Sequence, residues 1–241
     1  MIGKGSNMVI DPHFSIRYAQ LSPDFSVPQV QHEYVTLPAS MPVHKVMQYC
    51  VEQGLSGLEF MAGVPASVGG MVSMNFGCWG HEVSHYLHKV RLVDDQGEYR
   101  EVRAQDLEFA YRSSIFQRQP WVLLEAVFVL KKRDSLLIKQ DQHHNIQHRL
   151  LKQPLRQKTF GSIFKNPLGH HAAKLIEMAN LKGYQKGGAM ISDQHANFML
   201  NLNQATFDDV DALIKHVIDR VYHVHQVVLE PEVKLISKEQ V

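Results

Sequence analysis

The stretch from Gly57 to Gly80 is unusually rich in glycine and other small residues. Its densest part reads Gly63-Val64-Pro65-Ala66-Ser67-Val68-Gly69-Gly70, and it continues through Asn75, Gly77 and Gly80. Omitting so many side chains costs backbone entropy on folding, and a fold tolerates that cost where the backbone must closely approach a ligand or another backbone segment. We therefore interpret this stretch as one wall of a cofactor site.

A second glycine-rich loop, Gly3-Lys4-Gly5-Ser6-Asn7, precedes a short apolar strand at residues 8–10. Two glycines among small residues allow backbone amides to converge on an anion such as a pyrophosphate. A plain tight turn uses the same residues, and from this loop alone we favour the turn. The loop is not a Rossmann fingerprint, because that motif needs a preceding strand and a glycine where Met8 stands.

The composition narrows the class of protein. With 241 residues, 44% hydrophobic and 20% charged, the chain can build one large globular domain or two or three small ones. Its formal charge of +1 gives no general attraction to nucleic acid or to an anionic membrane. The two cysteines, Cys50 and Cys78, favour a reducing compartment, and no stretch approaches the roughly 18 apolar residues of a membrane helix. We expect a cytoplasmic protein, and a monomer because no large apolar stripe is left unassigned.

The 15 histidines raise the question of a metal site. His81, His85 and His88 would share one face if their segment were helical. A closed zinc site wants four ligands of defined geometry, however, and no thiolate is in reach. We favour a solvated or half-buried histidine cluster here and at the pairs 143–144 and 170–171, and we expect no metal.

Hydrophobic periodicity predicts elements along the whole chain. A helix should begin near Val43 and end at Gly54, with an apolar face made of Val43, Val46, Met47, Cys50 and Val51. The run 122–131 fits a strand buried on both faces. Other strands are expected over 8–10, 32–37, 90–94, 98–103, 197–202 and 232–236. A polar, helix-prone linker should span 134–158, and helices with apolar stripes should cover 172–179 and 208–225. The sequence pattern changes after the linker, and this change predicts a domain boundary near Thr159.

Five blocks in sequence order resemble the UDP-N-acetylenolpyruvoylglucosamine reductase (MurB) family. The first two are the glycine-rich segments 3–7 and 57–75, and the third is Phe109-Ala110-Tyr111-Arg112-Ser113-Ser114-Ile115-Phe116. The fourth and most specific is Phe160-Gly161-Ser162-Ile163-Phe164-Lys165-Asn166-Pro167. The last comprises Gly183-Tyr184, His195-Ala196-Asn197-Phe198 and Leu229-Glu230-Pro231-Glu232-Val233-Lys234. The resemblance covers nearly the whole chain.

The resemblance implies an α+β fold. An FAD-binding domain of the vanillyl-alcohol-oxidase/PCMH type, in two subdomains of which the first is truncated, would occupy 1–158 including the linker. An α+β substrate-binding domain would occupy 159–241. FAD is the implied cofactor and NADPH the implied cosubstrate. The residues expected to bind FAD are Gly3, Gly5, Ser6, Asn7, Gly63, Val64, Pro65, Ser67, Val68, Gly69, Gly70, Asn75 and Gly77.

The implied reaction reduces UDP-N-acetylglucosamine enolpyruvate, a nucleotide-sugar, to UDP-N-acetylmuramate for peptidoglycan synthesis. NADPH delivers hydride to FAD, and flavin N5 delivers hydride to C3 of the enolpyruvyl group. Hydride addition pushes charge onto C2 and its carboxylate, and that charge must be stabilised before C2 is protonated. The site therefore needs a cation, an acid and a hydrogen-bonding partner.

The resemblance assigns these three roles to Arg112, Ser162 and Glu232. Arg112 would face the carboxylate, Ser162 would protonate C2, and Glu232 would help to polarise or protonate the intermediate. As isolated residues they would be read as a surface arginine, a helix-capping serine and a strand-end glutamate, but within the matched blocks we favour catalysis. The residues expected to line the nucleotide-sugar site are Tyr111, Lys165, Asn166, Tyr184, His195 and Asn197. Simple packing of Tyr184 beside Gly183 is an open alternative.

The chain departs from the family pattern at its start, where the family has several tens of further residues with a Thr-x-x-x-Gly-Gly segment. We favour a start codon assigned too late over a true short form. Ala66 stands where the family usually has glycine, and Trp79 could cover the flavin or substrate pocket. The main alternative is a non-catalytic paralogue that binds flavin or nucleotide-sugar. An oxidase of another small molecule is disfavoured by the blocks 161–167 and 229–233.

Overall fold

The computed structural model describes residues 1–23 and 27–238. The chain divides into two compact units. The first comprises Met1–Gly5 and Tyr18–Gln147, and the second comprises Ser6–Arg17 and His148–Val241. The chain therefore passes from the first unit to the second between Gly5 and Ser6, and returns at Tyr18.

The first unit is built on a five-stranded antiparallel sheet in the order β2-β3-β9-β7-β8. Its strands are β2 (Gln29–Gln31), β3 (Tyr34–Pro38), β7 (Leu87–Val93), β8 (Tyr99–Arg103) and β9 (Val122–Val129). β9 lies at the centre, and five consecutive or near-consecutive side chains on it are buried: Leu123, Leu124, Ala126, Val127 and Phe128. A central strand covered on both faces buries both sets of alternating side chains, so the expectation for this run is confirmed.

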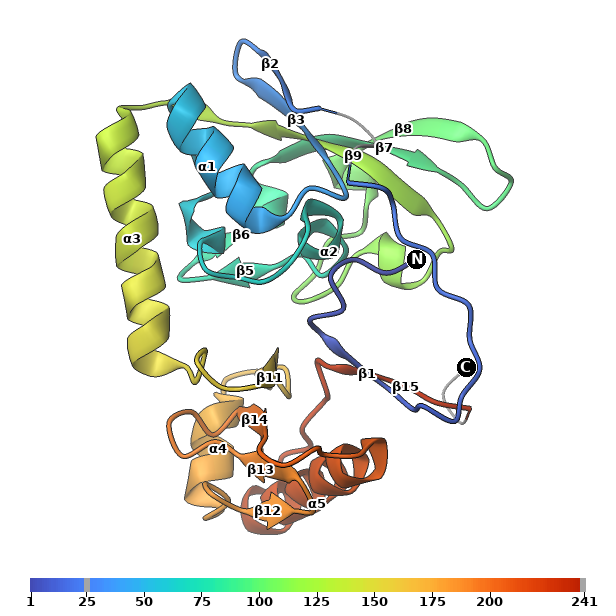
Figure 1. Ribbon diagram of the computed structural model, residues 1–241, viewed down its shortest axis with the longest axis vertical. Helices are drawn as coiled ribbons and strands as arrows, with labels where there is room; N and C mark the ends of the chain where they lie inside the picture. Colours follow the sequence, from blue (N-terminus) through green and yellow to red (C-terminus); the bar gives the residue numbers. More distant parts are fainter. Residues whose placement is uncertain (24–26, 239–241) are drawn as a thin grey trace. The chain divides into compact units, whose positions relative to one another are not determined.

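The helix expected near Val43 is α1 (Val43–Gln53), and α1 and α2 lie on one side of the sheet (Figure 1). Val43, Val46, Met47 and Cys50 form its buried face, each such burial stabilising the fold by about 1.5–3 kcal/mol. It ends at Gly54, whose φ of 61° is in the left-handed region that glycine adopts without strain. Both predicted ends are confirmed.

Short elements and one long helix complete the first unit. The expected strand over 32–37 begins later, because His32 has a φ of 56° and forms the tight turn between β2 and β3. The glycine-rich stretch contains a short helix that the periodicity did not predict, α2 (Val68–Ser73). The helix-prone linker is α3 (Ser135–Lys152). The remaining elements are β4 (Leu55–Ser56), β5 (Gly77–Cys78), β6 (His81–Glu82), β10 (Lys131–Lys132), η1 (Glu59–Met61), η2 (Val83–His85), η3 (Ala104–Asp106) and η4 (Ile115–Gln117).

The second unit contains a four-stranded antiparallel sheet in the order β11-β14-β13-β12. These strands are β11 (Thr159–Ser162), β12 (Gln185–Lys186), β13 (Ala189–Ile191) and β14 (Phe198–Asn201). Two helices, α4 (Ala172–Met178) and α5 (Phe207–His225), share its core. α5 buries the stripe expected from the sequence, and a reciprocal Thr206–Asp209 capping box begins it.

A separate parallel pair in the second unit joins β1 (Met8–Ile10) to β15 (Lys234–Ile236), with Met8 opposite Lys234. The strand expected over 232–236 therefore begins two residues later. The amides of Glu232 and Val233 donate instead to the Ile163 carbonyl, at 2.7 and 3.4 Å, so these two residues pair with another segment. The pairing brings the beginning and the end of the chain onto one small sheet.

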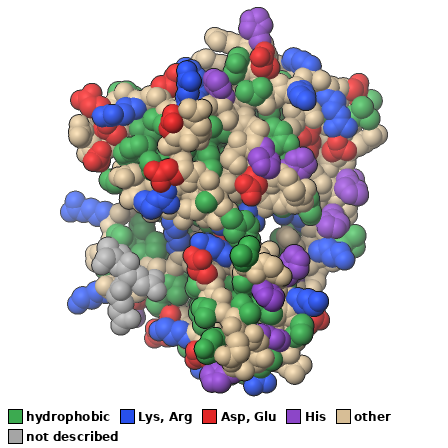
Figure 2. Space-filling model, turned by 180° about the vertical axis from the view of Figure 1, so that it is seen from behind, with side chains coloured by type: hydrophobic (Ala, Val, Ile, Leu, Met, Phe, Trp, Pro, Cys, Tyr) green, Lys and Arg blue, Asp and Glu red, His purple; other side chains and the backbone are tan. Residues whose placement is uncertain are grey.

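The three histidines at 81, 85 and 88 share no helical face. His81 lies in β6, His85 ends η2, and His88 lies in β7, so the helical geometry considered from the sequence is wrong for this segment. His81 Nδ1 lies 2.7 Å from the Tyr86 hydroxyl, and the His88 ring packs on Tyr34. Figure 2 shows histidine side chains at several separate places on the side of the molecule that it displays. Within 1–23 and 27–238, no group of three or more His, Cys, Asp or Glu side chains could hold a metal ion.

None of the helices in the described part of the chain combines the length and hydropathy that a bilayer crossing requires.

Candidate active site

The two glycine-rich segments meet within the first unit. A Cβ placed on Gly3 would lie 2.7 Å from Ser67 Oγ, so the backbone of the first loop lies directly against the N-terminal end of α2. Ser67 caps α2, accepting a hydrogen bond from the Gly70 amide at 3.3 Å. Gly5 has a φ of +68°, and a Cβ there would meet nothing within 4 Å. The loop is thus packed against Ser67 at Gly3 and faces open space at Gly5.

Several predicted cofactor residues have structural contacts of their own. The Val68 amide donates to the Met41 carbonyl, and the Gly69 amide donates to the Ala39 carbonyl. A Cβ on Gly69 would lie 3.2 Å from both Cβ and O of Ala39. Close packing of α2 on the end of β3 therefore explains this glycine without a ligand, and Val68 lies buried in the core.

Asn75 and Gly77 serve the hairpin β5–β6. Asn75 is buried and donates both amide hydrogens, to Glu82 Oε2 at 2.9 Å and to the Ala110 carbonyl at 3.1 Å. A Cβ on Gly77 would lie 2.7 Å from Glu82 Cγ. Both residues are thus needed for the hairpin, and the Asn75 side chain has no donor left for a cofactor.

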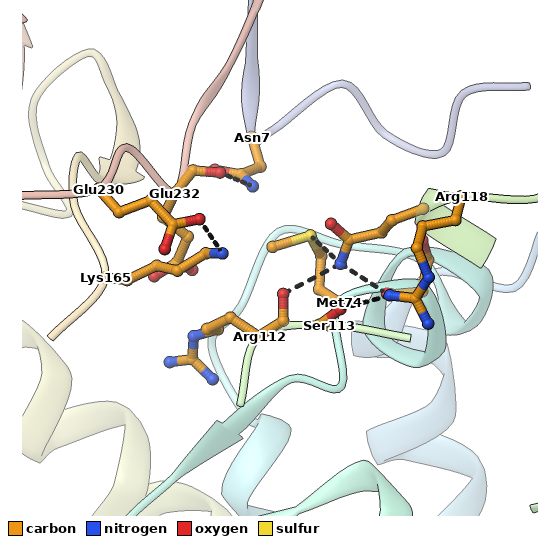
Figure 3. Close-up of polar contacts among 10 residues, drawn as sticks. Asn7, Met74, Arg112, Ser113, Arg118, Lys165, Glu230 and Glu232 are labelled. Atoms are coloured by element: carbon orange, nitrogen blue, oxygen red, sulfur yellow. Dashed lines mark hydrogen bonds and ion pairs between the residues drawn. The ribbon is translucent and has the colours of Figure 1, made fainter. Parts of the chain in front are cut away.

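Arg112 lies in a tight turn whose flanking residues, Ala110 and Ser113, exchange two backbone hydrogen bonds. Its φ is 55°, a conformation that costs a non-glycine residue about 1–2 kcal/mol and that surrounding contacts must hold in place. Gln117 supplies such a contact, because its Nε2 donates to the Arg112 carbonyl and to the Ser73 carbonyl, both at 3.0 Å. The turn is thereby fixed to the end of α2 (Figure 3).

The Arg112 guanidinium is held between two aromatic rings. Its Cζ lies 5.4 Å from the ring centroid of Phe76 and 5.4 Å from that of the half-exposed Tyr111. Contacts of this kind fix the direction of a cation at little desolvation cost. The third block therefore presents an oriented positive charge, as a carboxylate-binding role would require.

Ser162 ends β11, where the pairing with β14 is irregular between Thr159 and Ser162. The preceding Gly161 has a φ of +90°, and a Cβ there would meet nothing within 4 Å. Beyond Ser162, the Phe164 amide donates to Asn197 Oδ1 at 3.0 Å, and Asn197 Nδ2 donates to the Phe164 carbonyl at 2.7 Å. The Asn197 side chain thus acts as a clamp that replaces a strand partner at Phe164.

The segment after Ser162 runs beside the Leu-Glu-Pro-Glu block. The Glu232 amide donates to the Ile163 carbonyl at 2.7 Å, the Lys165 amide donates to the Glu230 carbonyl at 2.9 Å, and Phe164 bridges to Pro231. Lys165 Nζ and Glu230 Oε1 form an ion pair at 2.5 Å (Figure 3). Within this unit, the structure thereby brings Glu232 beside the segment that carries Ser162 and Lys165, which is distant from it in the sequence.

The other predicted substrate residues make distinct contacts in the second unit. Asn166 Oδ1 accepts a hydrogen bond from the Ala172 amide at the start of α4. The Tyr184 ring stacks on His216 of α5, with 4.4 Å between the ring centroids. This contact fits the packing alternative for Tyr184 as well as a role in binding. His195 lies edge-on to Phe198, and burial is the main cause of the lowered pKa of its imidazole.

Sequence reasoning gave one residue at this site a different role and missed a second. Asn7, expected to bind cofactor, uses its side-chain amide to donate to the Glu232 carbonyl at 3.1 Å. Lys234 begins β15, and desolvation together with the neighbouring charge of Lys165 lowers the pKa of its ammonium group. Lys234 closes the last matched block, but only the pairing of β1 with β15 shows that both residues belong beside Glu232.

The comparisons with known proteins agree with this geometry. A model of the FAD binding domain matches residues 1–103, which include both glycine-rich segments. A model described as UDP-N-acetylenolpyruvoylglucosamine reductase, C-terminal domain, matches residues 153–236, which include Ser162 and Glu232. The fold and the site thus define an FAD-dependent oxidoreductase of the α+β class.

The relatives narrow that class to one family. UDP-N-acetylenolpyruvoylglucosamine reductase of Halalkalibacterium halodurans is 40% identical over 240 residues, covering 99% of this chain and 79% of that protein. The reductase of Bacillus subtilis is 38% identical over 98% of this chain and 79% of its own length. The crystal structure of the Thermus caldophilus reductase (MurB) superposes with a TM-score of 0.83 at 32% identity, covering 98% of this chain and 84% of the other. This chain belongs to the UDP-N-acetylenolpyruvoylglucosamine reductase family, as its sequence blocks predicted.

Proposed function

We propose that this chain reduces UDP-N-acetylglucosamine enolpyruvate to UDP-N-acetylmuramate in peptidoglycan biosynthesis, with NADPH as reductant. The observation that carries this proposal is the meeting of the Ser162 block and the Glu232 block through backbone hydrogen bonds between residues 163–165 and 230–233 of the second unit.

The residues of the first unit fit an FAD molecule. A Cβ on Gly3 would lie only 2.7 Å from Ser67 Oγ at the start of α2, whereas a Cβ on Gly5 would meet nothing within 4 Å. We propose that the pyrophosphate lies here, held by backbone groups of the loop 3–7 and by the stretch 63–70, with Ser67 at the N-terminal end of α2. Val68, Gly69, Asn75 and Gly77 would then shape the wall, because their own contacts are made within the protein. When bound, FAD supplies hydride transfer from NADPH to C3 of the enolpyruvyl group.

Three side chains would handle the charge and the proton that follow. Arg112, oriented by Phe76 and Tyr111, stabilises the negative charge that develops on the substrate carboxylate. Ser162 donates its hydroxyl proton to C2. A serine hydroxyl is a weak acid, so this step depends on a site from which water is excluded and on a strongly basic carbon. Glu232, fixed through its amide to Ile163, polarises the serine or the intermediate.

The remaining predicted residues would bind the nucleotide-sugar in different ways. Lys165 forms an ion pair with Glu230, and the diphosphate of the substrate would replace this carboxylate as the partner of the ammonium group. Tyr111, Tyr184 and His195 offer ring faces or edges. Asn166 and Asn197 use side-chain atoms to hold α4 and Phe164, so they support the site from within the protein.

The organisation of the whole protein follows the same proposal. The FAD-binding domain corresponds to 1–158 with its linker, and the substrate-binding domain to 159–241. Nucleotide-sugar chemistry and the two scattered cysteines, Cys50 and Cys78, favour the cytoplasm. We propose a monomer, because each unit has its own buried core.

Product analysis tests the proposal. Purified protein loaded with FAD is incubated with NADPH and UDP-N-acetylglucosamine enolpyruvate in D₂O, and the product is examined by NMR and mass spectrometry. The proposal predicts UDP-N-acetylmuramate carrying deuterium at C2, because the proton on Ser162 exchanges with solvent. Bound FAD with no product, in D₂O or in ordinary water, would contradict the proposed reaction and would favour the non-catalytic paralogue.

A further inference from the structure

Glu232 lies between two strand pairings, and its carbonyl takes part in neither of them. Pro231 forms the bridge to Phe164, and β15 begins at Lys234. The Glu232 amide donates to the Ile163 carbonyl at 2.7 Å, and the Val233 amide shares that acceptor at a longer 3.4 Å. The peptide between Glu232 and Val233 is therefore held weakly on its amide side and can rotate about that contact unless its carbonyl is held as well. A catalytic carboxylate needs its backbone fixed on both sides, since its side chain follows the orientation of the peptide.

Asn7 supplies the second contact. Its side-chain Nδ2 donates to the Glu232 carbonyl at 3.1 Å, and its own carbonyl accepts from the Lys234 amide at 3.1 Å (Figure 3). Asn7 thus forms hydrogen bonds with the residues on both sides of Val233, immediately before the β1–β15 pairing starts at Met8 and Lys234. Ile163 and Asn7 together hold the peptide group between Glu232 and Val233, Ile163 at its amide and Asn7 at its carbonyl.

We propose that Asn7 is a positioning residue for Glu232, acting in the substrate half-reaction rather than as a ligand of the cofactor. This inference rests on the proposed function of Glu232. It departs from the expectation drawn from the glycine-rich loop, in which Asn7 binds the cofactor. The two roles differ in which measurements an Asn7 variant changes.

Asn7→Asp and Asn7→Ala test the assignment. The first keeps the size of the side chain but places a carboxylate oxygen against the Glu232 carbonyl, and the second removes the donor without adding charge. Asn145→Asp is the matched control, because Asn145 Nδ2 also donates to a glutamate backbone carbonyl, that of Glu59 at 2.9 Å, in the first unit. Each variant is compared with the wild type in FAD affinity, in thermal stability and in two anaerobic half-reactions, flavin reduction by NADPH and flavin reoxidation by substrate.

We expect both Asn7 variants to bind FAD and to be reduced by NADPH within about twofold of the wild type, while reoxidation by substrate slows roughly tenfold or more, as when a reacting group is displaced by a fraction of an ångström. Asn145→Asp should leave both half-reactions unchanged. Weakened FAD binding with a normal reoxidation rate would overturn the proposal and make Asn7 a cofactor ligand. Equal slowing of both half-reactions, with a loss of stability like that of the control, would also overturn it and leave a purely structural role.

Amide hydrogen exchange separates this inference from the proposed function. In Asn7→Ala, exchange in a peptide covering 230–236 should quicken about fivefold or more, since Glu232 and Val233 lose a restraint, while a peptide from β9 stays unchanged. Unchanged exchange at 230–236 would overturn the positioning role whatever the protein catalyses. Faster exchange in a protein whose wild type shows no reoxidation would instead uphold the contact and reject the proposed reaction.

Discussion

Replacing Asn197 with alanine should destabilise the second unit through a loss that can be worked from its contacts. Asn197 and Phe164 are both buried, with 5% and 1% of their surfaces exposed, and two hydrogen bonds of 3.0 and 2.7 Å join them. The change leaves the amide and the carbonyl of Phe164 without partners in a buried site. Each such group costs about 1–3 kcal/mol, so the free energy of unfolding should fall by about 2–6 kcal/mol.

The assay must report on the second unit. Both tryptophans, Trp79 and Trp121, lie in the first unit, so tryptophan fluorescence is a poor probe of this change. Urea unfolding followed by circular dichroism, with hydrogen exchange of a peptide covering 160–166, reports on it directly. Asn201→Ala is the control on the same strand, because Asn201 accepts one hydrogen bond in an exposed position and should cost about 0.5–1.5 kcal/mol. Equal losses for the two variants would refute the clamp.

Two further predictions concern ionisation. Burial, with the Glu59 charge adding to it, raises the pKa of the Cys50 thiol to about 12, so at pH 8 only about one Cys50 in ten thousand is ionised. A thiol reagent should label the half-exposed Cys78 in the folded protein and both cysteines in urea, and rapid labelling of a folded Cys78→Ser variant would contradict this. Burial lowers the pKa of His195, so the unfolded state binds its proton more readily, and stability should fall as the pH drops through about 6.5. Urea midpoints at pH 7.5 and 5.5 should therefore differ less in His195→Gln than in the wild type, and an equal difference would show that His195 does not contribute.

Local sequence pattern was sufficient to predict α1, β9 and the buried face of α5. The apolar positions of α1 and the glycine at 54 predicted that helix to the residue, and the double-sided apolar run predicted β9 as a central strand. The stripe on α5 predicted its buried face in the same way. In each case one segment carries the whole signal, because a periodic buried face is encoded within the element itself.

Other features depended on contacts between distant segments. α2 was missed because its glycines resemble a loop, and only packing on Ala39 and capping by Ser67 make it helical. The histidines at 81, 85 and 88 were considered for a helical face because spacing alone does not show that two strands and a 3₁₀ turn carry them. The contact of Asn7 with Glu232 accompanies the pairing of β1 with β15, two segments far apart in the sequence, which no local pattern encodes.

The proposed catalytic residues were assigned from family resemblance and not from a physical pattern. An isolated Ser162 or Glu232 has no sequence signal for catalysis, since proton transfer depends on where a group lies. The structure adds the joining of their backbones through Ile163, and the holding of Arg112 between Phe76 and Tyr111. Their roles in the reaction stay predictions that kinetics must test.

The most direct test of the proposed mechanism is a single-turnover experiment under anaerobic stopped flow. Flavin absorbance is followed as NADPH bleaches it and as UDP-N-acetylglucosamine enolpyruvate restores it, in the wild type and in Ser162→Ala. We predict both phases in the wild type, with the second slowed by about a hundredfold or more in the variant and the first unchanged, as expected for loss of a proton donor used only with substrate. Restoration of colour at the wild-type rate in Ser162→Ala, with normal product, would contradict the account.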